Sequence, residues 1–113
     1  MESSEFYTPK KGDIIWMNPK VGSTEENKKR RLGLVVSNNQ FNQSTLLVVI
    51  CPITATIQPG ATRFTLRDSG EVKGQVLIPQ LESLDTRNNK VEYIEKLSIS
   101  DMAKIDQIIG YIF

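Results

Sequence analysis

The chain contains no histidine, and this absence excludes more chemistry than any other feature of its composition. Imidazole serves proteins as a general acid or base, as a member of catalytic triads and as a metal ligand. Every active-site design that depends on imidazole, which includes most hydrolase sites, is therefore excluded.

Cysteine is nearly absent as well. Cys51 stands alone, so it has no partner for an internal disulfide, and a zinc site built from a cysteine cluster is excluded. The carboxylates are scattered, and the seven glycines form neither of the phosphate-binding patterns of nucleotide cofactors. We expect no metal, no cofactor and a reducing compartment, the cytoplasm.

Long apolar runs are also missing. No window approaches the roughly 20 apolar residues of a membrane span, and residues 1–10 are polar. The chain has 113 residues, of which 39% are hydrophobic, and this is enough to bury one core. We therefore expect a single domain over residues 1–113 and no membrane partner.

The formal net charge of +1 conceals an uneven distribution along the chain. Up to Arg67 there are nine Lys/Arg and five Asp/Glu, a net charge of about +4, whereas the remainder has five and eight, about −3. The basic residues are densest in the run Lys28-Lys29-Arg30-Arg31. Such a run is either a solvated loop or an edge that binds phosphates, and the residues alone leave both interpretations open.

Hydrophobic periodicity predicts several short strands. The polar stretch at 37–44 is typical of a loop, and Pro52 is expected to close the strand before it. In one segment the alternation of polar and apolar residues places Phe64 and Leu66 inward. The strands are expected at residues 14–17, 32–36, 45–50, 62–67, 74–78 and about 91–94.

Near the C-terminus the period changes from two to about 3.6, which predicts a helix. Ser98 or Ser100 can cap its start, and Asp101 suits its first turn. Short strands followed by one helix favour a mainly β fold, a small antiparallel barrel with a C-terminal helix. The apolar stripe of this helix consists of Met102, Ile105, Ile108, Ile109 and Ile112.

Basic, hydroxyl and carboxylate side chains remain for chemistry. They suffice for cleavage of RNA by its own 2′-hydroxyl, because the protein then needs only to stabilise a charged phosphorane and move protons. Arg31 suits a clamp on phosphoryl oxygens, since a guanidinium offers five donors in a fixed fork. Thr54 can donate its hydroxyl to the same group, or it can bond local backbone at a strand end.

Five short segments together carry a family resemblance. They are Gly12-Asp13-Ile14-Ile15-Trp16; Gly22-Ser23; Arg31 before Leu34-Val35-Val36-Ser37; Pro52-Ile53-Thr54; and Gly74-Gln75-Val76-Leu77 with Gln80 and Asp85. Their order and spacing resemble the MazF/PemK family of toxins along nearly all of the chain. Three features depart from the family pattern. Leu32 stands where a proline usually follows the arginine, and Pro79 stands where some members have an aspartate. The family's Gly-Ser-Glu-Gln appears as Gly22-Ser23-Thr24-Glu25 with a longer run to Arg31, so the acid is Glu25 by shift and not by register.

The resemblance implies an SH3-like small antiparallel barrel of the CcdB/PemK type. It also implies a sequence-specific, metal-independent endoribonuclease toxin, an mRNA interferase, that leaves a 2′,3′-cyclic phosphate and a 5′-hydroxyl. By the same likeness Arg31 and Thr54 are the catalytic residues, with Arg30 as the alternative for the arginine. The general base and the RNA sequence that is cut stay open.

Other residues are candidates for RNA contacts. The cations offer charge for phosphates, and an exposed aromatic ring can stack on a base, whereas Trp16 lies in an apolar strand and is assigned to packing. The expected RNA-binding set is Ser23, Glu25, Lys28, Lys29, Arg30, Phe41 and Gln80.

The expected partners follow from the helix and from the resemblance. Tyr111, Ile112 and Phe113 extend the apolar stripe beyond what one small barrel covers, which predicts a homodimer. The resemblance adds single-stranded RNA as substrate and an acidic antitoxin as inhibitor. Two other functions stay open: a gyrase-poison-like toxin that acts through residues 110–113, and an SH3-like module that binds RNA without cutting it.

Overall fold

The computed structural model describes residues 7–17, 31–66 and 70–113. The expectations for Ser23, Glu25, Lys28, Lys29 and Arg30 therefore fall outside the described residues. The elements, in chain order, are β1 (Asp13–Met17), β2 (Arg31–Val35), α1 (Asn39–Thr45), β3 (Leu47–Thr54), β4 (Arg63–Leu66), β5 (Gly74–Leu77), the 3-10 turn η3 (Ile78–Gln80), β6 (Glu82–Asp85), β7 (Val91–Lys96) and α2 (Ile99–Ile112).

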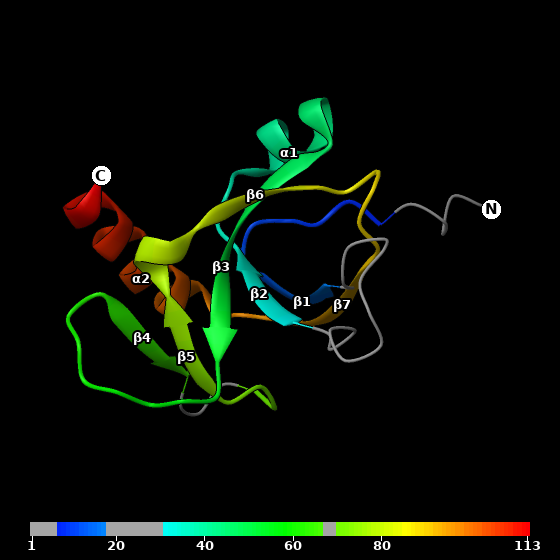
Figure 1. Ribbon diagram of the computed structural model, residues 1–113. Helices are drawn as coiled ribbons and strands as arrows, with labels where there is room; N and C mark the ends of the chain where they lie inside the picture. The colour runs from blue at the N-terminus through cyan, green and yellow to red at the C-terminus, as the bar shows by residue number, and fades with distance from the viewer. Residues whose placement is uncertain (1–6, 18–30, 67–69) are drawn as a thin grey trace.

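The strands form one antiparallel sheet in the order β4-β5-β3-β2-β1-β7. On one edge β3 pairs only with β2, but on the other it has two partners in succession: β6 along 47–50 and β5 along 53–54. Figure 1 shows the curved sheet, with α2 beside β5 and α1 at the start of β3. The expected fold class, a mainly β barrel-like sheet with a C-terminal helix, is confirmed.

The sheet buries an apolar cluster on each of its faces. The larger cluster includes Leu34 and Val76 and is covered by Met102 and Ile105 of α2. The helix begins as one of the two expected caps allows, because the backbone N–H of Asp101 donates to the Ser98 hydroxyl. The second cluster consists of Ile15, Met17, Val35, Val48 and Ile50.

The first of the five motifs, which begins at Gly12, holds the start of β1 against β7. Gly12 has φ +92°, and a Cβ there would lie 3.2 Å from Cδ of Lys96, so both its conformation and its surroundings favour glycine. Asp13 is 2% exposed and accepts from Nζ of Lys96 at 2.7 Å, from the backbone N–H of Lys10 at 2.9 Å and from the Tyr7 hydroxyl. A buried carboxylate with three donors holds the segment before β1 against β7.

The loop expected at 37–44 is wrong, because α1 occupies most of it. Asn38 caps this helix by accepting from the backbone N–H of Phe41 at 2.8 Å. Asn42 is fully buried and donates to the carbonyl of Pro9 at 3.0 Å, while the hydroxyl of Ser37 donates to it. A short helix held by a buried amide has no apolar stripe, so hydrophobic periodicity does not detect it.

The expected end of the third strand at Pro52 is also wrong, because β3 continues to Thr54. Pro52 lies opposite Gly33 of β2 and falls between the parts of β3 that pair with β6 and β5. The missing proline N–H is tolerated at this gap in the ladder. The strand β6 was not expected, because its sequence Glu-Ser-Leu-Asp has no apolar run.

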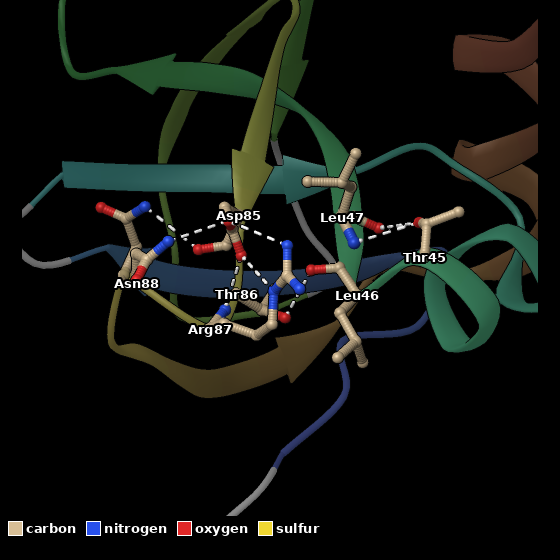
Figure 2. Close-up of polar contacts among 8 residues, drawn as sticks. Thr45, Leu46, Leu47, Asp85, Thr86, Arg87 and Asn88 are labelled. Carbon is tan, nitrogen blue, oxygen red and sulfur yellow. Dashed lines mark hydrogen bonds and ion pairs between the residues drawn. The ribbon is translucent and has the colours of Figure 1, made fainter.

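Hydrogen bonds join the residue before β3 to the turn after β6 (Figure 2). Leu46 has φ 60°, and its carbonyl accepts from the backbone N–H of Thr86 at 3.0 Å and from the Thr86 hydroxyl at 2.7 Å. Asp85 accepts from the backbone N–H of Arg87 at 2.9 Å and from Nδ2 of Asn88 at 2.9 Å. Asp85, one of the residues that carry the family resemblance, therefore shapes the turn between β6 and β7.

No helix in the described parts of the chain is long and apolar enough to cross a membrane.

Candidate functional site

The strand register brings Arg31 and Thr54 together. Leu32 of β2 pairs with Ile53 of β3 in an antiparallel ladder. Arg31 and Thr54 each lie one residue beyond that pair, in the directions that place them opposite each other on one face of the sheet. Two residues far apart in sequence thus lie opposite each other where β2 begins and β3 ends.

The Thr54 side chain is oriented by its own backbone. Its Oγ1 accepts from the backbone N–H of Thr56 at 3.2 Å, which is the local bond expected of a hydroxyl at a strand end. Because the oxygen is the acceptor in this bond, the hydroxyl hydrogen can be donated to another group. The local bond and a role toward substrate are therefore compatible.

Arg31 forms an ion pair with a residue that was not expected at the site. Its Nη2 lies 3.2 Å from Oε2 of Glu82 on β6, and the two side chains are 56% and 41% exposed. Exposure on this scale keeps both charges in contact with water, so the pair adds little to stability. It places a cation and a carboxylate together on an open surface.

A polar row continues from Thr54 across β5 to β4. Gln75 lies opposite Thr54 on β5 and is 3% exposed. Its Oε1 accepts from Nη1 of Arg63 at 3.0 Å and from the backbone N–H of Gln58 at 3.1 Å, and its Nε2 donates to the Thr65 hydroxyl at 3.0 Å. A satisfied buried amide therefore holds a second guanidinium near the end of β3.

The remaining expected residues lie in three places. Gln80 is exposed in η3, two residues before Glu82, so the same segment carries both. Phe41 is 37% exposed on α1. Figure 1 shows α1 at the start of β3, whereas Thr54 is the last residue of that strand. The other expected residues belong to the segment 18–30, which lies outside the described residues and joins Met17 to Arg31, a pair in the β1–β2 ladder.

Two titratable groups away from this face, the thiol of Cys51 and the phenol of Tyr7, are affected by burial. Cys51 is fully buried, and this burial raises the pKa of its thiol to about 12, which makes it a poor nucleophile. Burial and the bond to Asp13 raise the pKa of Tyr7 above its ordinary range. Within the described residues no group of three Cys, Asp or Glu side chains is arranged to hold a metal ion.

Sequence reasoning missed Glu82, Gln75 and Arg63 as parts of this face. Gln75 lies in a segment that was noted for the family resemblance and as a strand, and Arg63 lies in the alternating strand in which Phe64 and Leu66 were placed inward. Glu82 has no local signal at all, because its importance depends on an ion pair that spans 51 positions in the chain.

The face combines a guanidinium, an oriented hydroxyl and a carboxylate. A guanidinium and a hydroxyl can both donate to the oxygens of one phosphoryl group, and a carboxylate can accept a proton. Such groups can together promote transfer of a phosphoryl group from an ester oxygen of a phosphodiester to a neighbouring hydroxyl.

Known proteins resemble this chain in sequence and in fold. Residues 10–113 match the family described as "PemK-like, MazF-like toxin of type II toxin-antitoxin system". A search of curated proteins found no match.

Solved structures give the same result. A MazE–MazF complex (Form II) from Deinococcus radiodurans is similar with 28% identity and a TM-score of 0.80, covering 95% of this chain and 96% of that chain. MazF (Form I) from the same organism has 28% identity and a TM-score of 0.79, with 95% and 97% covered. An endoribonuclease in complex with its cognate antitoxin from a mycobacterial species has 23% identity and a TM-score of 0.75, with 91% and 92% covered, and this likeness concerns the fold.

Proposed function

This chain belongs to the PemK-like, MazF-like toxin family of type II toxin–antitoxin systems, as its motifs predicted, and on that premise we propose that it is a sequence-specific endoribonuclease. Its substrate is single-stranded RNA, which it cuts without a metal ion by means of the RNA's own 2′-hydroxyl. The observation that carries the proposal is the cross-strand placement of Arg31 and Thr54 on an open face.

Each of the two residues has a defined task. Arg31 binds the non-bridging phosphoryl oxygens and stabilises the negative charge that grows on them as the 2′-oxygen attacks. Thr54 donates its hydroxyl to the same phosphoryl group while the Thr56 N–H holds its oxygen in place. Cleavage leaves a 2′,3′-cyclic phosphate on one product and a 5′-hydroxyl on the other.

RNA on either side of the cut is bound by charge and stacking. Gln80 is two residues before Glu82 and offers a polar contact beside it. Phe41 on α1 provides a stacking surface for RNA that extends to the start of β3. Arg63 offers a further phosphate contact from β4. Ser23, Glu25, Lys28, Lys29 and Arg30, in the segment attached to Arg31, complete the proposed set, with Arg30 as the alternative catalytic arginine.

The proposed setting is a cytoplasmic homodimer that an acidic antitoxin inhibits. Tyr111 and Phe113 are 81% and 73% exposed at the end of α2, which supports an apolar contact with a second copy. The MazE–MazF complexes among the similar structures support an antitoxin partner.

One experiment separates this function from its competitors. Purified protein is incubated in three samples. The first contains single-stranded RNA, the second contains the same RNA with EDTA, and the third contains the RNA with a 2′-deoxy residue 5′ of the cut. Nuclease activity predicts cleavage of the first two samples only, with the deoxy RNA still bound. Binding without cleavage supports the RNA-binding module, and inhibition of gyrase without cleavage supports the gyrase poison. Cleavage of the deoxy RNA contradicts attack by the 2′-hydroxyl.

A further inference from the structure

The proposed reaction needs a group that accepts the 2′-hydroxyl proton, and neither Arg31 nor Thr54 is suited to this. A guanidinium stays protonated in proteins, and a neutral hydroxyl is a weak base. A carboxylate is a suitable acceptor because glutamate is normally ionised at neutral pH.

Glu82 lies at the required place. It is opposite Ile50 in the β3–β6 ladder, and cross-strand pairs point to the same face, so it shares a face with Ile50. Ile50 lies four residues before Thr54 in β3, so the alternation of a strand puts both side chains on the same side. The contact of 3.2 Å with Nη2 of Arg31 shows that the carboxylate reaches across this face to the guanidinium.

Three other carboxylates of the described residues bind donors away from Arg31. Asp13 is buried beneath Tyr7 and Lys96, and Asp85 binds Arg87. Glu95 accepts from the backbone N–H groups of residues 71 and 72, at 3.0 Å each. Glu82 is the carboxylate that contacts Arg31 within the described part of the chain.

We infer that Glu82 is the general base of the cleavage reaction, an inference that rests on the proposed function. The carboxylate takes the proton of the 2′-hydroxyl, and the freed electron pair of the 2′-oxygen forms the bond to phosphorus. The bond from phosphorus to the 5′-oxygen breaks, and that oxygen takes a proton from water. Glu82 then returns its proton to the solvent, so the protein is unchanged.

The ion pair is compatible with substrate binding. Arg31 contacts Glu82 through one nitrogen, Nη2, whereas a guanidinium has five N–H donors. The other donors can bind a phosphoryl oxygen while Nη2 keeps the carboxylate close to the 2′-hydroxyl of the same nucleotide. In the described residues Arg31 of β2 forms an ion pair with Glu82, and Asp85, which is on β6 with Glu82, is paired with Arg87.

The test compares Glu82→Gln with the matched control Glu71→Gln, an exposed glutamate outside the site. It also includes Glu25→Gln, one of the two acids in the segment 18–30 and the one in the proposed RNA-binding set. Single-turnover cleavage is measured from acidic to neutral pH, and binding is measured with the 2′-deoxy RNA. We expect Glu82→Gln to lower the rate about 100-fold or more and to abolish the rise of the rate with pH. Binding should be unchanged or tighter, and Glu71→Gln should match the wild type.

Three results would overturn the inference. A faster Glu82→Gln enzyme would mean that the carboxylate only competes with RNA for Arg31. An unchanged rate and pH profile would remove Glu82 from the reaction, and loss of activity in Glu25→Gln alone would place the base in the cationic segment. Inactive wild-type protein would instead contradict the proposed function itself. Thermal unfolding of each variant, with Glu82→Asp as a second substitution, separates misfolding from loss of the base.

Discussion

Gly74 and Thr54 approach so closely that a Cβ on Gly74 would lie 2.3 Å from the carbonyl oxygen of Thr54. Gly74 also has φ +127°, a backbone conformation that residues other than glycine rarely adopt. The start of β5 therefore fixes the end of β3, where the proposed catalytic threonine lies.

Replacing Gly74 by alanine should displace Thr54 and strain the backbone. We expect a loss of about 1 to 3 kcal/mol in the free energy of unfolding, together with a loss of RNA cleavage. Chemical denaturation and a cleavage assay measure the two effects. Gly110→Ala is the control, since nothing lies within 4 Å of a Cβ there and alanine in a helix should stabilise by about 0.5 to 1 kcal/mol. Equal stability of Gly74→Ala and wild type would contradict the close approach.

Arg31→Ala should remove the clamp on the transition state. The expected loss is about 3 kcal/mol or more, roughly a hundredfold in kcat/KM. Folding should survive, because the exposed ion pair with Glu82 contributes little to stability. Steady-state cleavage rates test this, with Lys104→Ala on the exposed side of α2 as the control. If Arg30→Ala is inactive and Arg31→Ala is active, the neighbouring arginine is the catalytic one.

Thr54 should matter for its hydroxyl rather than its shape. Thr54→Val keeps the volume but loses the donor, so turnover should fall on the order of a hundredfold while binding of uncleavable RNA changes much less. Thr54→Ser keeps both the donor and the acceptor for the Thr56 N–H, and it should retain most of the rate. Equal rates for valine and serine would show that the hydroxyl serves only the local turn.

Cys51 should resist alkylation in the folded protein. Its pKa of about 12 means that almost no thiolate exists at pH 8, and the side chain is fully buried as well. Mass spectrometry after treatment with iodoacetamide should find the thiol unmodified, whereas the same reagent in denaturant should modify it. Rapid labelling of the folded chain would show that the larger core opens readily.

Asp85 should make stability depend on acidity. The hydrogen bond from the Arg87 side chain, helped by the Arg87 backbone N–H, lowers the pKa of Asp85. A lowered folded-state pKa stabilises the protein above the unfolded-state value, and this stabilisation is lost as the pH falls through the folded-state value. Asp85→Asn should therefore lower Tm at neutral pH, with a difference that shrinks in acid and in high salt. A constant difference from neutral to strongly acidic pH would contradict this account.

Local patterns in the sequence were enough for α2 and for most of the strands. The helix has a repeating apolar stripe and a serine cap, and the buried strands have apolar runs, so each carries its own signal. The family motifs also pointed to Arg31 and Thr54, since the resemblance attaches roles to particular positions.

Other features arose only when distant segments came together. The helix α1 depends on a buried Asn42 that reaches back to Pro9, and β6 depends on the free edge of β3. The ion pair of Arg31 with Glu82 likewise joins two strands that both flank β3. Hydrophobic periodicity records which side of an element is buried, but it does not record which polar groups meet across a sheet, because strand pairing and register decide that.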